Sequence, residues 1–368
     1  MTDASREVRR SSRQRGRSGT VASAAGAATA ALSAVLVSLL SPAEARAQGK
    51  TTVADRIPPT NGSGVGLNLF QPAVDGKGFF SVNGADVLGG GGVSVGLVLD
   101  YGHDMLPLNP SHGSDWAVTH AFKGVLHFDY GIAGILVVGV TAPVVIDAGG
   151  KLTDVGPGGK KDYDTDPLSA QALGDLALHV KVPILRPDGP IGVALVARAG
   201  VGVGESRNFA SEPGFFYWPE LVLEERVGHV LRLALNAGYR GHTGDNAVFG
   251  VARDGKPQLR SGVFESSNLF TGSFALSVRA AGALDLVAET YATYQIGGAS
   301  DRRQRLSAEA MGGLKLFLPK SARWRPRSSY VSLGLGPGYA PGFQTAQVRA
   351  TLGFVYEPAL GDPGQKPE

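Results

Sequence analysis

Charged side chains recur inside long, otherwise apolar stretches of this sequence, where they alternate with aliphatic residues. Arg279 and Asp285, for example, lie on either side of Ala281-Gly282-Ala283 within FALSVRAAGALDLVAE. Carboxylates and cations in such surroundings can transfer protons or can form ion pairs. We predict that the following charged residues share one inward face: Asp100, Lys123, Asp129, Asp175, Lys181, Arg198, Glu220, Glu224, Arg232, Arg240, Arg279, Asp285, Glu289, Glu309, Lys315 and Arg349.

The set contains equal numbers of acidic and basic residues, eight of each. A channel selective for one sign of ion is expected to bias its lining, whereas mixed charges can pair into networks that fill a narrow lumen. The balance therefore favours a filled interior, although a small and weakly selective pore fits the same pattern.

Histidines are the side chains most often used as general acids and bases, and the chain contains seven. His127 and His179 fall on inward positions, away from the outer rim where a lipid or peptide substrate would arrive, and there is no His-Glu-x-x-His motif. The acidic stretch from Asp147 to Ala172 could suggest calcium, but its spacing does not match an EF-hand loop. We predict no enzyme activity, no catalytic residues, no metal site and no cofactor, and we interpret residues 147–172 as a solvated surface loop.

The elements that carry these charges have a period of two, which is typical of β-strands with one apolar and one polar face. Residues 270–295 read as one hairpin with its turn at 281–283. In this register Arg279 lies opposite Asp285 and Phe270 opposite Tyr294. The stretch 135–145 shows little alternation, so the pattern does not show which of its side chains point inward.

Many of these strands run ten residues or more, which suits a tilted strand crossing about 30 Å of hydrocarbon. We predict an all-β fold, a transmembrane antiparallel up-and-down β-barrel of about 12 strands over residues 93–358, with a flexible tail at 359–368. Long loops at 147–172 and 241–263 are expected to be extracellular, and turns at 186–189 and 281–283 periplasmic.

The first 47 residues are typical of a signal peptide. Six Arg between positions 6 and 17 precede an apolar, Ala-rich run from Val21 to Leu40, and Ala45-Arg46-Ala47 places small residues at a cleavage site. We predict cleavage after Ala47, with an uncleaved membrane anchor as the alternative. The leader carries seven Arg against three acidic residues, so the net charge of +3 becomes about −1 without it, which removes the electrostatic case for a nucleic-acid partner. The chain contains no Cys and hence no disulfides.

Residues 48–92 are rich in Gly and Pro and contain two short apolar stretches, at 64–70 and 78–82. Two interpretations stay open. The segment is either a partly ordered periplasmic leader, which the composition favours, or a plug that enters the barrel.

Residues 79–108 (FFSVNGADVLGGGGVSVGLVLDYGHDMLPL) and 173–185 (LGDLALHVKVPIL) resemble the N-terminal β-barrel domain of some large OmpA-family outer-membrane proteins of Gram-negative bacteria. The resemblance covers most of the residues after the leader, and its motifs are loose strand patterns. It implies a Gram-negative outer-membrane barrel. The peptidoglycan-binding signature of that family, Asn-x-x-Leu-Ser-x-x-Arg-Ala, has no match here, so peptidoglycan binding is not expected.

Together these features predict a monomeric, non-enzymatic outer-membrane protein with a structural or small-pore role. The alternative is an outer-membrane transporter or porin for a small or hydrophobic solute, with residues 48–92 as plug. The expected partners are outer-membrane lipid and, during biogenesis, the barrel-assembly machinery. A lumen blocked by residues 48–92 would favour the transporter.

Overall fold

The structure is a computed structural model that describes residues 65–107, 116–150, 153–155, 161–164, 167–187, 191–203, 209–246, 248–249, 264–298, 302–318 and 329–358. The predicted signal peptide, residues 48–64 and the predicted tail at 359–368 lie outside these ranges.

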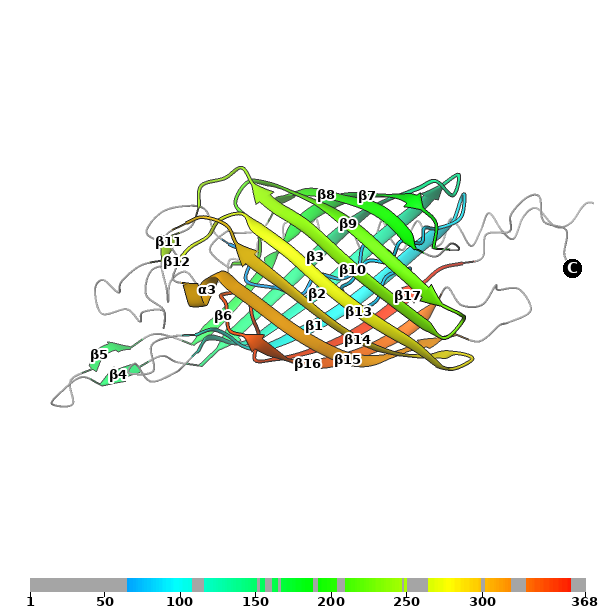
Figure 1. Ribbon diagram of the computed structural model, residues 1–368. Helices are drawn as coiled ribbons and strands as arrows, with labels where there is room; N and C mark the ends of the chain where they lie inside the picture. The colour runs from blue at the N-terminus through cyan, green and yellow to red at the C-terminus, as the bar shows by residue number, and fades with distance from the viewer. Residues whose placement is uncertain are drawn as a thin grey trace, which may run out of the picture. The chain divides into compact units, whose positions relative to one another are not determined.

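Twelve antiparallel strands form a closed barrel (Figure 1). They are β1 (Val93–Pro107), β2 (Trp116–Ile132), β3 (Leu136–Gly149), β7 (Asp175–Leu185), β8 (Gly192–Gly202), β9 (Phe215–Val227), β10 (Leu231–His242), β13 (Leu269–Ala281), β14 (Leu284–Gln295), β15 (Leu306–Phe317), β16 (Tyr330–Ala340) and β17 (Val348–Tyr356). Each strand pairs with the next, and β1 pairs with β17 to close the ring. The prediction of an all-β, antiparallel barrel of about 12 strands is confirmed.

The period-two pattern set the strand register correctly. In the hairpin of β13 and β14, Arg279 pairs with Asp285, Val278 with Leu286 and Phe270 with Tyr294, as predicted. The turn itself is Gly282-Ala283, one residue shorter than expected, because Ala281 pairs with Leu284 across a local irregularity in the ladder. Side chains alternate accordingly: Leu286 is 50% exposed, and the next residue, Val287, is 3% exposed.

The two ends of the barrel differ. Short elements extend from one of them, here called the long-loop end: β4 (Thr153–Val155), β5 (Lys161–Asp164), β11 (Val248–Phe249), β12 (Phe264–Glu265) and α3 (Arg302–Arg305) (Figure 1). The other, the short-turn end, carries tight turns such as Gly282-Ala283. No helix in the described ranges is long and apolar enough to cross a membrane.

The prediction of a loop over 147–172 was wrong in part. β3 continues to Gly149, and β6 (Leu168–Leu173) pairs with its final residues, beyond the point where β3 pairs with β7. The alternation of Leu168 and Ala170 with Ser169 and Gln171 supports a strand here. The run of Asp and Gly residues before it obscured that short signal.

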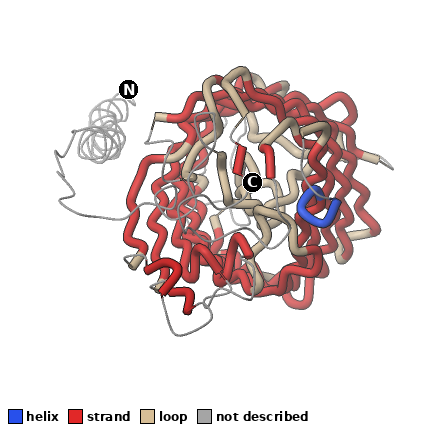
Figure 2. Tube along the Cα trace, turned by 90° about the vertical axis from the view of Figure 1, so that its left-hand side faces the viewer, coloured by secondary structure: helices blue, strands red, loops and turns tan. Residues whose placement is uncertain are grey.

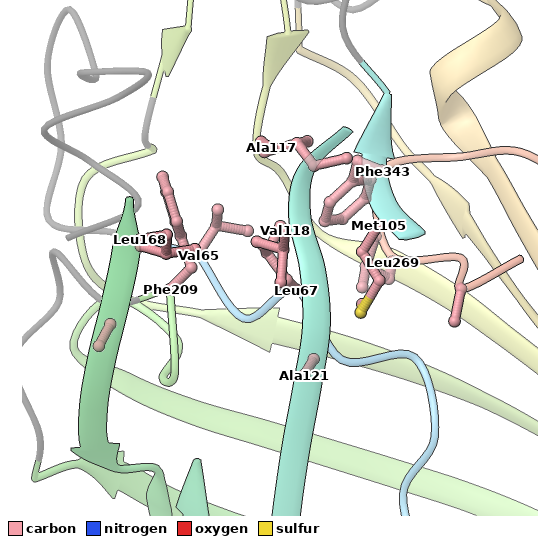
Figure 3. Packing of buried hydrophobic residues seen from close by; sticks show 13 residues of the cluster. Val65, Leu67, Met105, Ala117, Val118, Ala121, Leu168, Phe209, Leu269 and Phe343 are labelled. Atoms are coloured by element: carbon pink, nitrogen blue, oxygen red, sulfur yellow. The ribbon is translucent and has the colours of Figure 1, made fainter. Parts of the chain in front are cut away.

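One residue of β2 breaks the alternation. Val118 lies an even number of residues from the exposed Phe122 but is 1% exposed, because it packs in a buried cluster near the long-loop end. Figure 3 shows Val118 beside Val65 and Leu67, with Met105 and Phe209 in the same cluster. Side chains of other segments therefore cover this part of β2 and shield it from solvent.

Loop segments lie inside the ring of strands (Figure 2). Residues 65–88, called the internal segment below, supply many of the most buried apolar side chains, including Phe70, Val74 and Val82. Phe70, Phe79 and Phe80 pack with Val287 and Tyr291 of β14. The apolar core is therefore largely formed between the internal segment and the inward face of the wall.

Candidate functional site: the lumen and its internal segment

The internal segment has no regular secondary structure but is fixed by short-range backbone bonds. The amide of Ala73 donates to the carbonyl of Phe80 at 3.0 Å, and the amide of Phe79 to that of Val82 at 2.7 Å. Most of its remaining polar contacts are with side chains of the wall. Because buried backbone groups must be paired, these contacts decide where the segment can lie.

Wall carboxylates accept hydrogen bonds from it, and Asp100 of β1, for example, accepts one from the side-chain amide of Asn68 at 2.8 Å. Glu289 of β14 accepts from the amides of Phe80 at 3.0 Å and Ser81 at 2.9 Å, and from the hydroxyl of Ser81 at 2.7 Å. On β9, Glu224 accepts from the amide of Ala85 at 2.7 Å, and Glu220 from the side-chain amide of Asn83 at 2.6 Å. Bonds to ionised acceptors are stronger than neutral ones, so these anchors hold the segment firmly.

Wall cations donate to backbone carbonyls of the same segment. Lys315 reaches the carbonyl of Gly78 at 2.7 Å, and Arg232 that of Lys77 at 3.0 Å. Lys123 donates to the carbonyl of Phe70 at 3.3 Å and to the side-chain oxygen of Gln71 at 2.9 Å. The segment is thus held from several sides of the barrel.

Three ion pairs complete the attachment, one of them between Arg226 of β9 and Asp86 at 3.2 Å. Lys181 of β7 contacts Asp75 at 2.9 Å, and both side chains are 0% exposed. Lys77 contacts Glu357, which directly follows β17, at 2.7 Å. A fully buried pair is tolerated only with good geometry, and Lys181 donates to both carboxylate oxygens of Asp75.

Arg349 of β17 is the centre of a second network. It contacts Asp100 of β1 at 2.7 Å, forms a close ion pair with Glu309 of β15 and donates to Asn68 of the internal segment at 2.9 Å. The hydroxyl of Tyr291 donates to Glu309 at 2.7 Å. This network joins four wall strands, β1, β14, β15 and β17, to the internal segment.

His127, Asp129 and His179 meet inside the barrel. Nδ1 of His127 lies 2.9 Å from one oxygen of Asp129, and Nε2 of His179 lies 2.8 Å from the other. Gly96 and Gly139 make room for them, since a Cβ at Gly96 would collide with the His127 ring and one at Gly139 with Asp129 and His179. The three side chains are buried, as the inward assignment predicted for both histidines.

Residues 92–96 (Gly-Val-Ser-Val-Gly) match the spacing of a nucleophile elbow, Gly-x-Ser-x-Gly. An elbow needs a sharp turn between a strand and a helix that exposes the serine. Ser94 instead lies within the continuous strand β1 and is 0% exposed. The motif therefore carries no nucleophile here.

The sixteen predicted inward charges divide by exposure. The buried ones are Asp100, Lys123, Asp129, Lys181, Glu220, Glu224, Arg240, Asp285, Glu289, Glu309, Lys315 and Arg349. Asp175, Arg198, Arg232 and Arg279 are half-buried. Pairs within the set are Asp100 and Arg349, Glu309 and Arg349, Arg279 and Asp285, Arg198 and Glu220, Arg232 and Glu224, and Arg240 and Asp175.

Sequence reasoning missed the polar partners inside the internal segment, Asn68, Asp75, Lys77 and Asn83. A non-periodic segment gives no facing pattern, so nothing in the sequence links these residues to particular wall charges. It also missed Asp147, which was assigned to a solvated loop but is 4% exposed at the end of β3. The sequence carried no clear signal for it, because the preceding stretch, residues 135–145, shows little alternation.

A cavity lies between the internal segment and the wall formed by β2, β3 and β7 to β10. Its volume is about 60 Å³, and it is partly open to solvent. Its lining is mixed, with Val118, Val145 and Trp218 beside Lys123, Asp147 and Arg240. A concave, mainly apolar site with a few polar groups is the usual form of a small-molecule site.

No known protein family matches this sequence, and no curated protein matches it. Solved structures do resemble the fold. An outer membrane channel from Pseudomonas putida F1 aligns over 74% of this chain and 97% of that chain, with 12% identity and a TM-score of 0.49. The P. putida toluene transporter TodX aligns over 80% and 98%, with 9% identity and a TM-score of 0.40. The CymD monoaromatic hydrocarbon channel aligns over 74% and 90%, with 10% identity and a TM-score of 0.37. Likenesses this distant assign no function to this chain.

Proposed function

We propose that this protein is an outer-membrane β-barrel that transports a small solute and whose lumen is closed at rest by residues 65–88. The observation that carries the proposal is the set of contacts between the internal segment and the wall. These contacts involve charged side chains from strands around the barrel, including Lys123, Lys181, Glu224, Glu289 and Lys315.

The contacts favour a plug over simple filling. A barrel that only had to fill its interior could pair its wall charges with one another, as Arg279 and Asp285 do. Here many wall charges are instead directed at a separate piece of chain that precedes the first strand. Outer-membrane barrels commonly close a polar lumen with such a segment. A segment held by side chains rather than by strand pairing is able to move without opening the wall.

The outer surface supports a membrane location. Each wall strand exposes at least one large apolar side chain, while most charged residues of the wall turn inward; Glu225 of β9 is an exposed exception. Representative exposed residues are Leu97, Phe122, Ile146, Leu178, Leu195, Leu221, Leu235, Phe274, Leu286, Leu314, Leu333 and Leu352. A closed barrel with an apolar outer band satisfies its backbone groups within hydrocarbon. The outer membrane, reached after cleavage behind Ala47, is the proposed location, and the OmpA-family resemblance remains a prediction.

A reversible covalent link tests the plug, because the chain contains no native Cys. Ser81 and Glu289 are joined by hydrogen bonds, and both would be changed to Cys. Solute efflux from liposomes is then measured before and after a short, reducible bis-thiol crosslinker. Without the link the weakened anchor should give faster efflux than wild type, and the link should stop it until reductant is added.

The matched control links Val278 and Leu286, which face each other on the outward side of the wall, away from the internal segment. This link leaves the internal segment free, so it should not change efflux. If the Ser81 and Glu289 link left efflux unchanged, and the unlinked variant matched wild type, the segment would be a static filler and the barrel structural.

A further inference from the structure

Asp147 is the one buried carboxylate along this cavity whose surroundings the proposed function does not explain. It lies near the end of β3, opposite Ala121 of β2 and Ala170 of β6, and is 4% exposed. Both alanines belong to the buried apolar cluster that also contains Val118, Leu168 and Phe209. The carboxylate is therefore set into an apolar part of the lumen.

No residue in the described part of the chain donates a hydrogen bond to Asp147 or forms an ion pair with it. The cations that line the same cavity have other acceptors. Lys123 donates to Gln71 at 2.9 Å, Arg240 contacts Glu212 at 2.8 Å, and Arg198 lies 3.6 Å from Glu220. A buried carboxylate without a partner is strongly unfavourable, and such groups in clefts mark functional sites.

We propose that this cavity binds a small, largely apolar molecule carrying a protonated amine, and that Asp147 receives the ammonium group. This inference rests on the proposed function and names the class of solute. An ammonium supplies both the missing positive charge and the missing donors, which gives a charge-assisted hydrogen bond. The apolar body of the ligand fits beside Val118, Val125 and Val145, which line the same cavity.

Other ligand classes fit less well. An anion would meet the unpaired carboxylate, and the cationic side chains nearby are already engaged by Gln71, Glu212 and Glu220. A neutral alcohol could donate one hydrogen bond but would leave the negative charge of Asp147 uncompensated. The amine is thus the class that the geometry favours.

Calorimetric titration of the full chain in detergent tests the assignment with three probes on one skeleton: phenethylamine, 2-phenylethanol and 3-phenylpropanoate. For wild type, we expect the amine to bind at least tenfold more tightly than the alcohol and the carboxylate. Asp147→Asn should weaken the amine at least tenfold and leave the alcohol within twofold. Equal binding of amine and alcohol to wild type would overturn the proposal without recourse to any variant.

The control is Asp285→Asn, which removes a buried carboxylate that lines a different cavity and pairs with Arg279. It should leave amine binding unchanged, and a loss equal to that of Asp147→Asn would also overturn the proposal. Folding of each variant is checked by the mobility shift of heated and unheated samples on a denaturing gel. Calorimetry measures binding independently of transport. If the amine binds but the crosslink does not change efflux, only the transport function is refuted. If the crosslink changes efflux but the amine does not bind preferentially, only the ligand class is refuted.

Discussion

At the scale of single residues, exposure decides what an ion pair contributes. Lys181 and Asp75 have no exposure and hold the internal segment to β7, whereas the Arg279 side chain, paired with Asp285, is 24% exposed. When one member of an ion pair is mutated, water can solvate the charge that remains if that side chain is partly exposed. Water cannot reach the remaining charge if the side chain is buried. The same chemical pairing should therefore have different consequences at the two positions.

Lys181→Met should destabilise the folded barrel by about 3 to 5 kcal/mol, because it leaves Asp75 buried without its partner. The double change with Asp75→Leu should be milder, since no charge remains buried there. Asp285→Ala should have an effect of about 1 kcal/mol or less, because the charge that remains, on Arg279, is 24% exposed and can be solvated by water. Urea unfolding in detergent measures all three, and a Lys181→Met variant as stable as wild type would contradict the buried attachment.

Glycine packing offers a second test at this scale. Gly139→Val places a side chain against Asp129 and His179 and should destabilise the barrel by at least about 2 kcal/mol. Gly272→Val is the matched control, because nothing lies within 4 Å of a Cβ at that strand position. Thermal unfolding compares them. Equal stability of the two variants would mean that the buried cluster of His127, Asp129 and His179 is not formed.

At the scale of elements, alternation was enough to place most strands. The ladder of β13 and β14 follows the predicted register, because a shift by one residue would turn Leu286 inward and Asp285 toward the outer surface. The same rule failed where the period was weak. β3 contains Pro143 and a run of β-branched residues, so the pattern could not show that Asp147 continues the strand on its inward face.

Strand connections at the two ends predict the orientation of the barrel. A Cys placed at Gly150, at the long-loop end, should react with an impermeant thiol reagent on intact cells. A Cys at Gly282, in the tight turn of β13 and β14, should react only after the outer membrane is permeabilised. A Cβ at either position would have nothing within 4 Å, so the changes themselves are harmless. The opposite labelling pattern would invert the proposed topology.

At the scale of the whole molecule, the barrel wall depends on patterns local to each strand, whereas the position of the internal segment depends on contacts between residues far apart in the sequence. The wall could be predicted, because each strand carries its own apolar and polar faces. The position of residues 65–88 could not, because their partners are single side chains such as Glu289 and Lys315, more than 200 residues away in the chain. Only the folded barrel brings those side chains around Phe80 and Gly78. For this reason the composition of residues 48–92 favoured a partly ordered periplasmic leader, whereas the structure places residues 65–88 inside the barrel.

In the proposed function, residues 65–88 close a lumen that is otherwise open to solutes. Planar-bilayer recording tests this closure most directly, on wild type and on a chain in which residues 65–88 are replaced by a Gly/Ser sequence of equal length. Water entering the vacated lumen would solvate the wall charges, so the barrel should still fold, as the gel-mobility assay can verify. We expect wild type to be mostly closed and the replaced chain to show steady single-channel conductance. If the folded replacement were as silent as wild type, the account of residues 65–88 as a plug would be contradicted.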